Sequence, residues 1–572
     1  MHRMTRLLGA IGIALTLSPP PASAGSILDT KHNLSLSGPG TIKSATETRV
    51  CVFCHAPHNA RRDVTPLWNR SDTTVNYTTY QSSTLHAAVG QPTGASKLCL
   101  SCHDGTIALG SVLTSAQEIP FAGGIRFLPE GPSRLGTDIS DDHPISFRYD
   151  AALAASNGEL KSPASLTGAV KLDASGELQC TACHDPHDDR NGKFLVMNNR
   201  RSALCTTCHD RNGWAAASHA SSGASWNGSG ANPWPHTPYR TVDDNGCENC
   251  HRPHTAGGHA RLLNFALEED NCLVCHDGNV AGSNIENELL KGYGHRVQDY
   301  AGIHDPAEDF TSGTVSTHVE CVDCHNPHQA NADTAVAPDA PGALKGVKGI
   351  TASGTATASV AYLYEVCFKC HADNNVTTVA DISRRHQQLN TRLEFDLGNP
   401  SYHPVEGAGK NPDVPSLITP YTVSSVIYCT DCHNNDDGPG NNGSGPRGPH
   451  GSDNRFLLER NYTTQDHTKE SSFEYALCYK CHSRSNILND RSFKEHSKHV
   501  EGEDAPCSAC HDPHGVSATQ GSSSNATHLI NFDTNIVKPN RSGLLRFEDL
   551  GRFRGRCYLS CHGEDHDPKT YP

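Results

Sequence analysis

One short motif, Cys-x-x-Cys-His, recurs eleven times in this 572-residue chain, and a twelfth copy carries one extra residue between its cysteines. Together the copies contain all 24 cysteines, so none is left for a disulfide, a zinc site or a catalytic thiol. The regular cysteine pairs are Cys51 and Cys54, Cys99 and Cys102, Cys180 and Cys183, Cys205 and Cys208, Cys247 and Cys250, Cys272 and Cys275, Cys321 and Cys324, Cys367 and Cys370, Cys429 and Cys432, Cys478 and Cys481, and Cys507 and Cys510. The stretched copy has Cys557 and Cys561.

This motif is the attachment sequence of a c-type haem, in which two thiols add to the vinyl groups and the adjacent histidine ligates the iron. A single copy would also suit half of a zinc site or a vicinal disulfide. Neither of these requires a histidine after every cysteine pair, so we expect twelve covalently attached haems c. The proximal iron ligands would be His55, His103, His184, His209, His251, His276, His325, His371, His433, His482, His511 and His562.

Residues 1–24 have the pattern of a cleavable secretory signal. Met1–Arg6 is short and basic, Leu7–Leu17 is apolar, and Ala22-Ser23-Ala24 precedes the expected cleavage point. The apolar stretch is too short to span a bilayer, and no nearby cysteine could accept a lipid. We therefore expect an exported protein without a membrane span, extracellular or on the outer cell surface, with the periplasm as the alternative.

The chain is acidic, with a formal net charge of −15. Loss of residues 1–24, which hold two arginines and no acidic residue, would change it to −17. Such a charge argues against nucleic acid and anionic membranes as partners. It permits basic proteins, metal cations and positively charged mineral surfaces. The expected partners are other redox proteins or cytochromes, and metal oxide or soluble metal acceptors.

An ordinary side-chain core is not expected, because only 35% of the residues are hydrophobic and the chain holds 50 Gly and 34 Pro. The composition predicts mainly irregular coil with short α-helices and little β structure, organised around a chain of stacked haems. A β-hairpin is expected near Val170–Gln179, where Asp173-Ala174-Ser175-Gly176 offers a turn.

The motifs form six pairs, an internal repeat that predicts six dihaem modules. In five pairs the first motif continues as His-x-Pro-His. The last histidine of this segment cannot reach the far face of its own haem, so we expect it to serve a neighbouring haem. In the fifth pair His450 is expected to replace the missing histidine after an insertion. The modules would span residues 25–125, 126–225, 226–285, 286–380, 381–485 and 486–572, numbered here as modules 1 to 6.

The supply of histidine is sufficient for a second ligand at every iron. Outside the motifs and His2 there are 22 histidines for twelve distal positions, and Met197 is the only methionine after residue 24. Bis-histidine iron and low reduction potentials are therefore expected. His318, His496 and His528 compete with His295, His499 and His514 for this role. With one upstream and one downstream histidine per module, the proposed distal ligands are His32, His58, His143, His187, His236, His254, His295, His328, His403, His450, His499 and His514.

The segments Cys180–Asp210 and Cys247–Asp277 resemble the doubled-CXXCH multihaem cytochromes. The opening segment, with His32-Asn33-Leu34-Ser35, Gly38-Pro39-Gly40 and Cys51–His55, further resembles outer-surface cytochromes of metal-reducing bacteria. The resemblance implies extracellular electron transfer. Some relatives form filaments in which an axial histidine crosses between subunits, and by analogy His32 would be the donated ligand.

Two classes of function are therefore expected. The first is an electron-transfer conduit of twelve haems that delivers electrons to metal or mineral acceptors, with a filament subunit as a compatible form. The second is a multihaem oxidoreductase in which one open haem acts on a small nitrogen or sulfur oxyanion. The haem at Cys557, Cys561 and His562 is the candidate for the second class. No catalytic side chain is expected, and the Cys-x-x-Cys-Lys motif common in such enzymes does not occur.

Overall fold

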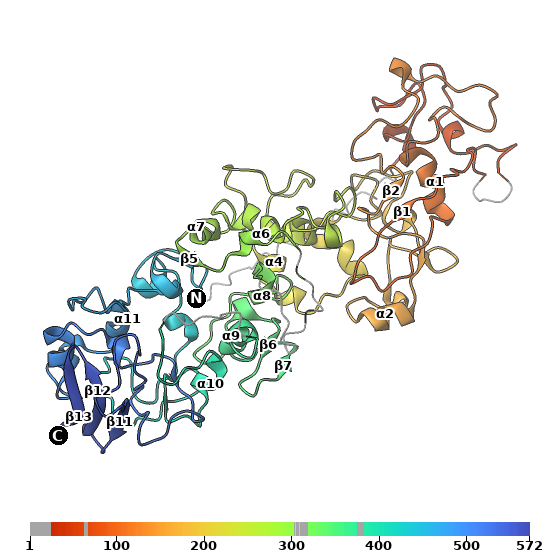
Figure 1. Ribbon diagram of the computed structural model, residues 1–572. Coiled ribbons are helices and arrows are strands. Elements are labelled where there is room, and N and C mark those ends of the chain that lie inside the picture. Colours follow the sequence, from red (N-terminus) through yellow and green to blue (C-terminus); the bar gives the residue numbers. More distant parts are fainter. Residues whose placement is uncertain are drawn as a thin grey trace, which may run out of the picture.

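The computed structural model describes residues 25–61, 67–302, 304, 308, 318–374 and 382–571, so the expected signal peptide lies outside the described residues. The described chain is mostly coil with short helices and little β structure, as the composition predicted. Figure 1 shows an elongated molecule, with helix α1 (Gly94–His103) near one end and strands β11–β13 at the other. Sequence order broadly follows the long axis.

The helices are short because glycine, proline and the motif histidines interrupt them; α1 is the longest in the described chain. The other α-helices are α2 (Ala151–Asn157), α3 (Cys180–Cys183), α4 (Ser218–Ser221), α5 (Val242–Asn245), α6 (Glu268–His276), α7 (Ile285–Leu289), α8 (Cys321–Cys324), α9 (Tyr364–His371), α10 (Thr391–Phe395), α11 (Ala476–Tyr479) and α12 (Arg484–Leu488). The 3-10 helices are η1 (Ile27–Asp29), η2 (Cys51–Phe53), η3 (Ala122–Gly124), η4 (Pro163–Ser165), η5 (Arg200–Ser202), η6 (Cys205–Thr207), η7 (Trp214–Ala216), η8 (Gly246–Asn249), η9 (Ala260–Leu262), η10 (Val297–Asp299), η11 (Gly342–Leu344), η12 (Cys429–Asp431), η13 (Pro439–Asn441), η14 (Arg455–Leu457) and η16 (Cys507–Ala509). Element η15 (Lys498–Gly502) is a π-helical turn.

Most strands are two-residue pairings that tie distant segments together. The short pairs are β1 (Thr78–Thr79) with β2 (Asp138–Ile139), β3 (Phe147–Arg148) with β4 (Glu177–Leu178), β5 (Tyr293–Gly294) with β9 (Gly451–Ser452), β6 (Gly349–Ile350) with β7 (Ala356–Thr357), and β8 (Ser401–Tyr402) with β10 (Gly515–Val516). The exception is an antiparallel sheet at the C-terminal end. It contains β11 (Arg546–Asp549), β12 (Gly555–Cys561) and β13 (Glu564–Tyr571), in that order.

The hairpin expected within Val170–Gln179 is present only as a turn. The Gly176 N–H donates to the Asp173 carbonyl at 3.0 Å, and Gly176 has a φ of 74°, which glycine adopts without strain. Strand β4, which follows the turn, pairs with β3 from an earlier segment. The reason is packing, because Phe147 of β3 and Leu178 of β4 share one hydrophobic cluster.

The interior consists of small hydrophobic clusters distributed along the chain rather than one apolar core. Several contain motif cysteines, as where Cys54 and Cys102 pack against the cluster around Phe53. The largest fully buried side chain of the described chain is Arg70. Its guanidinium donates to the carbonyls of Ala108 at 3.0 Å and Leu109 at 2.8 Å. Polar bonding therefore supports the chain around the motifs alongside apolar packing.

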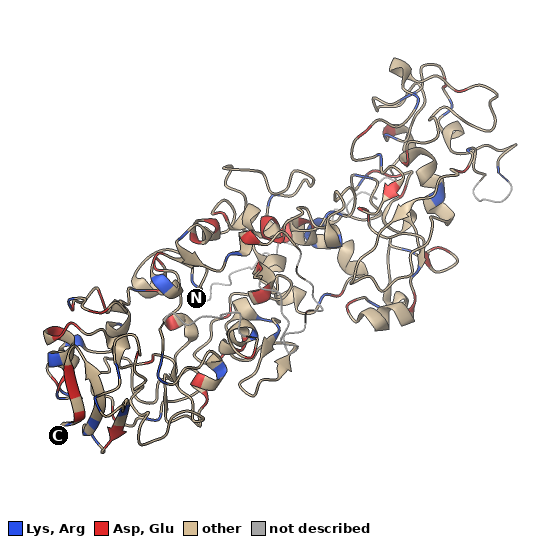
Figure 2. Ribbon diagram, viewed as in Figure 1, with Lys and Arg blue, Asp and Glu red and all other residues tan. Residues whose placement is uncertain are grey.

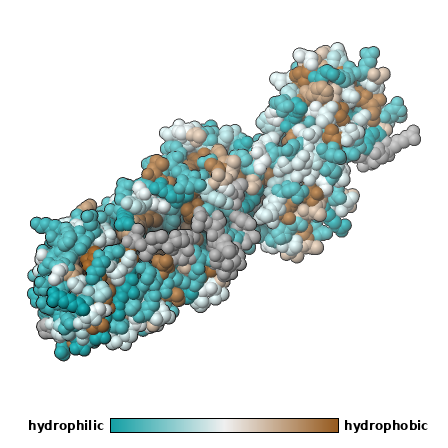
Figure 3. Space-filling model, in the orientation of Figure 1, coloured by the Kyte–Doolittle hydropathy of each residue, from teal (hydrophilic) through white to brown (hydrophobic). Residues whose placement is uncertain are grey.

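The surface mixes charges of both signs. Lysine and arginine are interspersed with aspartate and glutamate along the ribbon in Figure 2. The face seen in Figure 3 is largely hydrophilic, with hydrophobic residues in small separate patches. Within the described residues, no helix has the length and apolar character needed to cross a membrane.

Candidate haem-binding sites

We number the twelve motifs in chain order as sites 1 to 12. The eleven regular motifs each form a compact helical turn. In eight of them the backbone N–H of the histidine donates to the carbonyl of the first cysteine, at 2.8–3.0 Å. The other three, at Cys99, Cys272 and Cys367, end α1, α6 and α9. Because the turn is compact, both thiols and the histidine lie close together, as attachment to one haem requires.

A repeated backbone feature orients the motif histidine. His184 Nδ1 lies 2.9 Å from the carbonyl of Lys193, and His251 Nδ1 lies 2.9 Å from that of Arg261. His433 and His511 make the same contact, with the carbonyls of Phe456 and His528. A carbonyl only accepts, so Nδ1 carries the proton and the Nε2 lone pair is available to a metal.

These carbonyls belong to strained turns. Each carbonyl belongs to the first of two consecutive non-glycine residues with positive φ. The residue pairs are Lys193 and Phe194, Arg261 and Leu262, Phe456 and Leu457, and His528 and Leu529. Such residues cost about 1–3 kcal/mol each and persist only where the surrounding structure fixes them. In all four cases the next residue forms a β-bridge with the motif histidine. The strained turn thus fixes the orientation of the motif histidine ring.

Each regular motif histidine faces one further histidine ring, with ring centroids 6.0–6.5 Å apart. The pairs, from site 1 to site 11, are His55 with His187, His103 with His32, His184 with His254, His209 with His143, His251 with His328, His276 with His219, His325 with His450, His371 with His295, His433 with His514, His482 with His403, and His511 with His496.

This separation fits an iron atom between two rings. Two metal–nitrogen bonds of about 2 Å, together with half the width of each ring, give a centroid separation of roughly 6 Å. Rings in direct contact lie closer, as for His32 and Phe194 at 4.1 Å. Burial lowers the pKa of His184 to about 4 and that of His450 to about 3, which keeps both imidazoles neutral, as metal ligation requires. The residues of sites 1 to 11 therefore fit bis-histidine haem.

The His-x-Pro-His segments serve the module that precedes them. His187, which ends the segment of module 2, faces His55 of module 1. The carbonyl of Pro186 accepts from Nδ1 of His32 at 2.9 Å, and His32 faces the other motif histidine of module 1, His103. Pro327, Pro449 and Pro513 make the equivalent bond to His219, His295 and His403. One Pro-His unit thus supplies one facing ring and orients the other.

The first motif of the fifth pair lacks the His-x-Pro-His segment, but an inserted segment after it restores the same arrangement. The Asn435 side-chain oxygen accepts from the backbone N–H groups of His450 at 3.1 Å and Gly451 at 3.0 Å. Its amide nitrogen donates to the carbonyl of Pro446 at 2.7 Å. These bonds fold the insertion so that Pro449 and His450 take the place of the Pro-His unit. His450 consequently faces His325.

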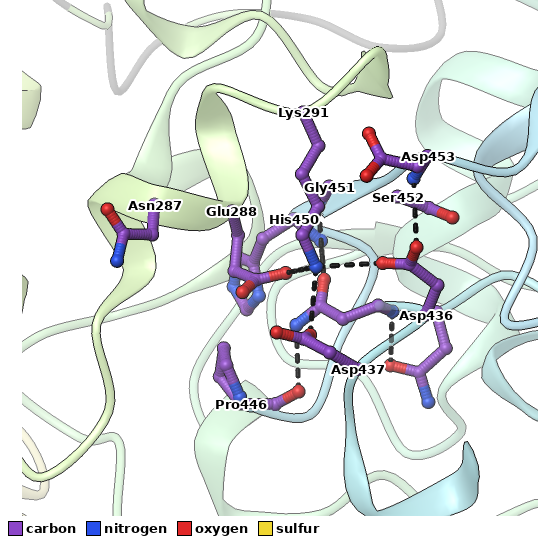
Figure 4. Close-up of polar contacts among 12 residues, drawn as sticks. Asn287, Glu288, Lys291, Asp436, Asp437, Pro446, His450, Gly451, Ser452 and Asp453 are labelled. Carbon is purple, nitrogen blue, oxygen red and sulfur yellow. Dashed lines mark hydrogen bonds and ion pairs between the residues drawn. The ribbon is translucent and has the colours of Figure 1, made fainter. Parts of the chain in front are cut away.

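An ion cluster beside His450 joins modules 4 and 5, as Figure 4 shows. Lys291 Nζ contacts the carboxylates of Glu288 at 2.8 Å, Asp436 at 2.7 Å and Asp437 at 2.9 Å. Burial lowers the pKa of Lys291, but hydrogen bonds to the three carboxylates raise it further, and the net shift is upward. Lys291 therefore stays charged and balances acidic groups from both segments.

Thiols of consecutive motifs also lie next to one another. Between modules, the first cysteines interact: contact with Cys180 raises the pKa of Cys99, and contact with Cys99 lowers that of Cys180 to about 7. The same contact joins Cys205 to Cys247, Cys272 to Cys321, Cys367 to Cys429, and Cys478 to Cys507.

Within modules, the second cysteines are the neighbours. Burial and the nearby Cys102 thiol raise the pKa of Cys54 to about 12. Cys208 has the same influence on Cys183, Cys250 on Cys275, Cys370 on Cys324, and Cys481 on Cys432. Cys510 responds in this way to Cys557 and Cys561. The attachment cysteines thus form one unbranched series in sequence order.

Nine of the twelve expected distal histidines face a motif histidine, and His58, His236 and His499 do not. His58, in module 1, is exposed and faces no motif histidine within the described residues. His236 instead places Nε2 3.1 Å from the carbonyl of Glu248. His499 faces His566, which belongs to no motif. His32, considered as a ligand for a second subunit, faces His103 of its own chain.

The motif histidines of sites 6 and 11 instead face His219 and His496, respectively. A sequence signal for His219 exists: it lies 28 residues before Cys247, close to the spacing of 26 shared by His295 and His403. His236 is only 11 residues before Cys247. The rings of the two remaining competitors face no motif histidine in the described structure: His318 faces His304, and the backbone carbonyl of His528 contacts His511.

Site 12 differs from the others. Cys557 and Cys561 lie on β12 and not on a helical turn like those of the regular motifs. His562 follows with a φ of 48°. Its Nε2 lies 3.0 Å from a carboxylate oxygen of Asp466, and its ring stacks on His467 with centroids 4.6 Å apart. That stack leaves no room for an iron atom between the two rings.

Comparison with known families agrees with this geometry. Residues 174–213 and 236–281 match the model of the doubled CXXCH motif family. They contain sites 3 to 6. These matches indicate a multihaem c-type cytochrome family. No curated protein matches this sequence.

Proposed function

We propose that the protein is a dodecahaem cytochrome that conducts electrons along a single file of haems. The observation that carries the proposal is the unbranched series of neighbouring attachment cysteines, which follows sequence order from site 1 to site 12. A thioether bond fixes a haem edge at each cysteine, so adjacent thiols imply adjacent haem edges. The elongated molecule in Figure 1 suits transfer between its two ends.

The haem, when bound, supplies one-electron chemistry at its iron. The chain supplies the rest. In this proposal the motif histidines of sites 1 to 11 would be the proximal ligands, and the eleven facing rings would be the distal ligands. Nδ1 contacts with carbonyls hold many of the rings in place, for example His184 with Lys193 and His295 with Pro449. Two histidine ligands at each iron of sites 1 to 11 would leave no position for a substrate there and would favour low potentials.

Charged side chains next to two of the facing histidines would change the reduction potentials of particular irons. His514 Nδ1 lies 3.0 Å from Glu394, which is buried. Burial lowers the pKa of His514, but the hydrogen bond and charge of Glu394 outweigh this effect, so the net shift is upward. His254 makes a similar contact with Asp142 at 2.9 Å. A carboxylate on Nδ1 makes the imidazole a stronger electron donor to iron, which favours the oxidised state.

The proposed setting is the cell exterior, with metal ions or mineral surfaces as electron acceptors and other cytochromes as donors. The secretory pattern of residues 1–24 and the acidic net charge support this setting. Self-association into filaments is compatible with it. The exposed His58 supports self-association, because the other five Pro-His units of the described chain serve the preceding module. Growth of assemblies by wild type but not by His58→Ala would support this part of the proposal.

The test combines composition, spin state and reactivity of the exported, oxidised protein. We expect about twelve haems per chain by mass spectrometry, and low-spin iron by low-temperature electron paramagnetic resonance. The reduced protein should then be fully reoxidised by soluble ferric complexes or ferric oxide particles. A count well below eleven would overturn the proposal. So would a high-spin iron that binds nitrite and sustains its steady-state reduction, because that result would identify an oxidoreductase.

A further inference from the structure

A second histidine pair lies beside site 12 and is not part of any motif. The rings of His499 and His566 face each other with centroids 6.5 Å apart and planes at 64°. This is the spacing found at sites 1 to 11, where the separation is 6.0–6.5 Å. The motif histidine, His562, has no ring at that distance among the described residues. Its own stacking neighbour, His467, is too close for an iron atom to fit between them.

We propose that the iron of the twelfth haem is held by His499 and His566, and that His562 is not an axial ligand. The inference rests on the proposed function, since it presumes haem at this site. His562 is already engaged, because Asp466 accepts from the nitrogen, Nε2, that would bind iron. Its positive φ follows directly from its place at the turn between β12 and β13.

The strands put His566 on the correct side of the sheet. His566 pairs directly with Leu559 across β12 and β13, and directly paired residues of an antiparallel sheet share a face. Leu559 packs in one cluster with Cys557 and Cys561. His566 therefore stands on the face that carries both attachment thiols. Its Nδ1 is buried without a hydrogen-bond partner in the described structure, which is unusual for a polar atom and is consistent with a ring placed for another purpose.

His499 is prepared for ligation in the same way as the rings at other sites. Its Nδ1 lies 2.7 Å from the carbonyl of Glu495, so the proton lies on Nδ1 and the Nε2 lone pair is available. The preceding turn carries His496, which faces His511 at site 11. A single segment of about one helical turn thus provides a ring for site 11 and a ring for site 12.

Aromatic packing joins this segment to strand β13. The ring of Phe493 stacks on His499 at 6.0 Å and meets the edge of Tyr571, on β13, at 4.5 Å. Burial also lowers the pKa of His566. The two facing rings are thus held by shared contacts, which favours a fixed separation over a chance approach.

The experiment compares His566→Ala, His499→Ala and His467→Ala in the full-length exported protein. All three changes lie outside the attachment motif, so covalent haem is expected to be retained, which mass spectrometry of the intact chain verifies. In His566→Ala and in His499→Ala, one iron in twelve should become high-spin by electron paramagnetic resonance. The matched control, His467→Ala, removes the ring stacked on His562 and should leave every iron low-spin.

Low-spin iron throughout in both His566→Ala and His499→Ala would overturn the inference, as would a high-spin iron in His467→Ala. A wild-type chain with eleven haems and none on Cys557 and Cys561 would also overturn it. That result leaves the file of sites 1 to 11 intact, so it differs from failure of the proposed function, which requires a count well below eleven.

Discussion

The ring of His187 lies 6.1 Å from that of His55, and the two planes differ by only 17°. These residues are 132 positions apart and belong to different modules. The same relation recurs along the chain, so the first motif histidine of each of modules 1 to 5 faces a ring from the next module. In the proposed bis-histidine arrangement, ligands donated between modules would hold the modules together, because the described chain has few long helices or sheets to do so.

The first prediction tests this donation. In His187→Ala, the iron of site 1 loses its second ligand, although the mutation lies in module 2. We expect one high-spin iron in twelve by electron paramagnetic resonance, with no change in haem count. The control is His86→Ala, whose ring faces no motif histidine in the described chain. An unchanged spin state in His187→Ala would contradict the assignment.

The second prediction separates two histidines that compete for site 6. The ring of His219 faces His276 at 6.3 Å, whereas Nε2 of His236 contacts a backbone carbonyl. His219→Ala should produce one high-spin iron in twelve, and His236→Ala should produce none. Electron paramagnetic resonance spectra of the two variants show which histidine is the ligand, because the variants differ only in which ring is removed. The opposite result would favour His236, which lies closer to Cys247 in the sequence, as the ligand at site 6.

Local patterns in the sequence predicted much of the site. The cysteine pairs, the motif histidines and the Pro-His units can be read directly, because each needs residues at fixed short spacing. The insertion before His450 was also interpretable, since a Pro-His pair reappears after it. Composition alone was enough to predict an irregular fold with short helices, which the structure confirms.

Long-range choices could not be predicted in the same way. His219 has a suitable spacing before Cys247, but its position opposite His276 depends on a contact with Pro327, 108 residues away, which no local pattern shows. The stretched motif at Cys557 forms part of a strand because β11 and β13 pair with it on both sides. Such pairing depends on residues outside the motif, so the motif alone could not predict the strand.

The third prediction concerns the potential of site 9. Glu394→Gln keeps the shape of the side chain next to His514 but removes its negative charge. Without that charge the oxidised iron is less stabilised, so the potential of this one haem should rise by tens of millivolts. Spectroelectrochemical titration should show a shift in about one-twelfth of the haem absorbance. Glu286→Gln, at an exposed position, is the control and should leave the titration unchanged.

The fourth prediction tests the ion cluster in Figure 4. Lys291→Met leaves the buried carboxylate of Glu288 without its cation, next to two further acidic groups. Because Glu288 is buried whereas Asp437 is half exposed, we expect a loss of about 2 kcal/mol, between the values for surface and buried pairs. Thermal unfolding measures this loss. Lys291→Arg keeps the charge and should recover most of the stability; equal stability of the methionine and wild-type proteins would contradict the role of the cluster.

The fifth prediction concerns the backbone contact that places His450. A Cβ atom on Gly451 would lie 1.8 Å from the carbonyl oxygen of Glu288, so α7 and β9 would have to separate. The pairing of β5 with β9 would be lost, and His450, the preceding residue, would move away from His325. Gly451→Ala should therefore cost about 1–3 kcal/mol, as overpacking does, and make the iron of site 7 high-spin in part of the molecules. Gly282→Ala is the matched control, since a Cβ there meets no atom within 4 Å. If Gly451→Ala retained both wild-type stability and low-spin iron, the close approach of these two backbones would not be what holds His450 in place.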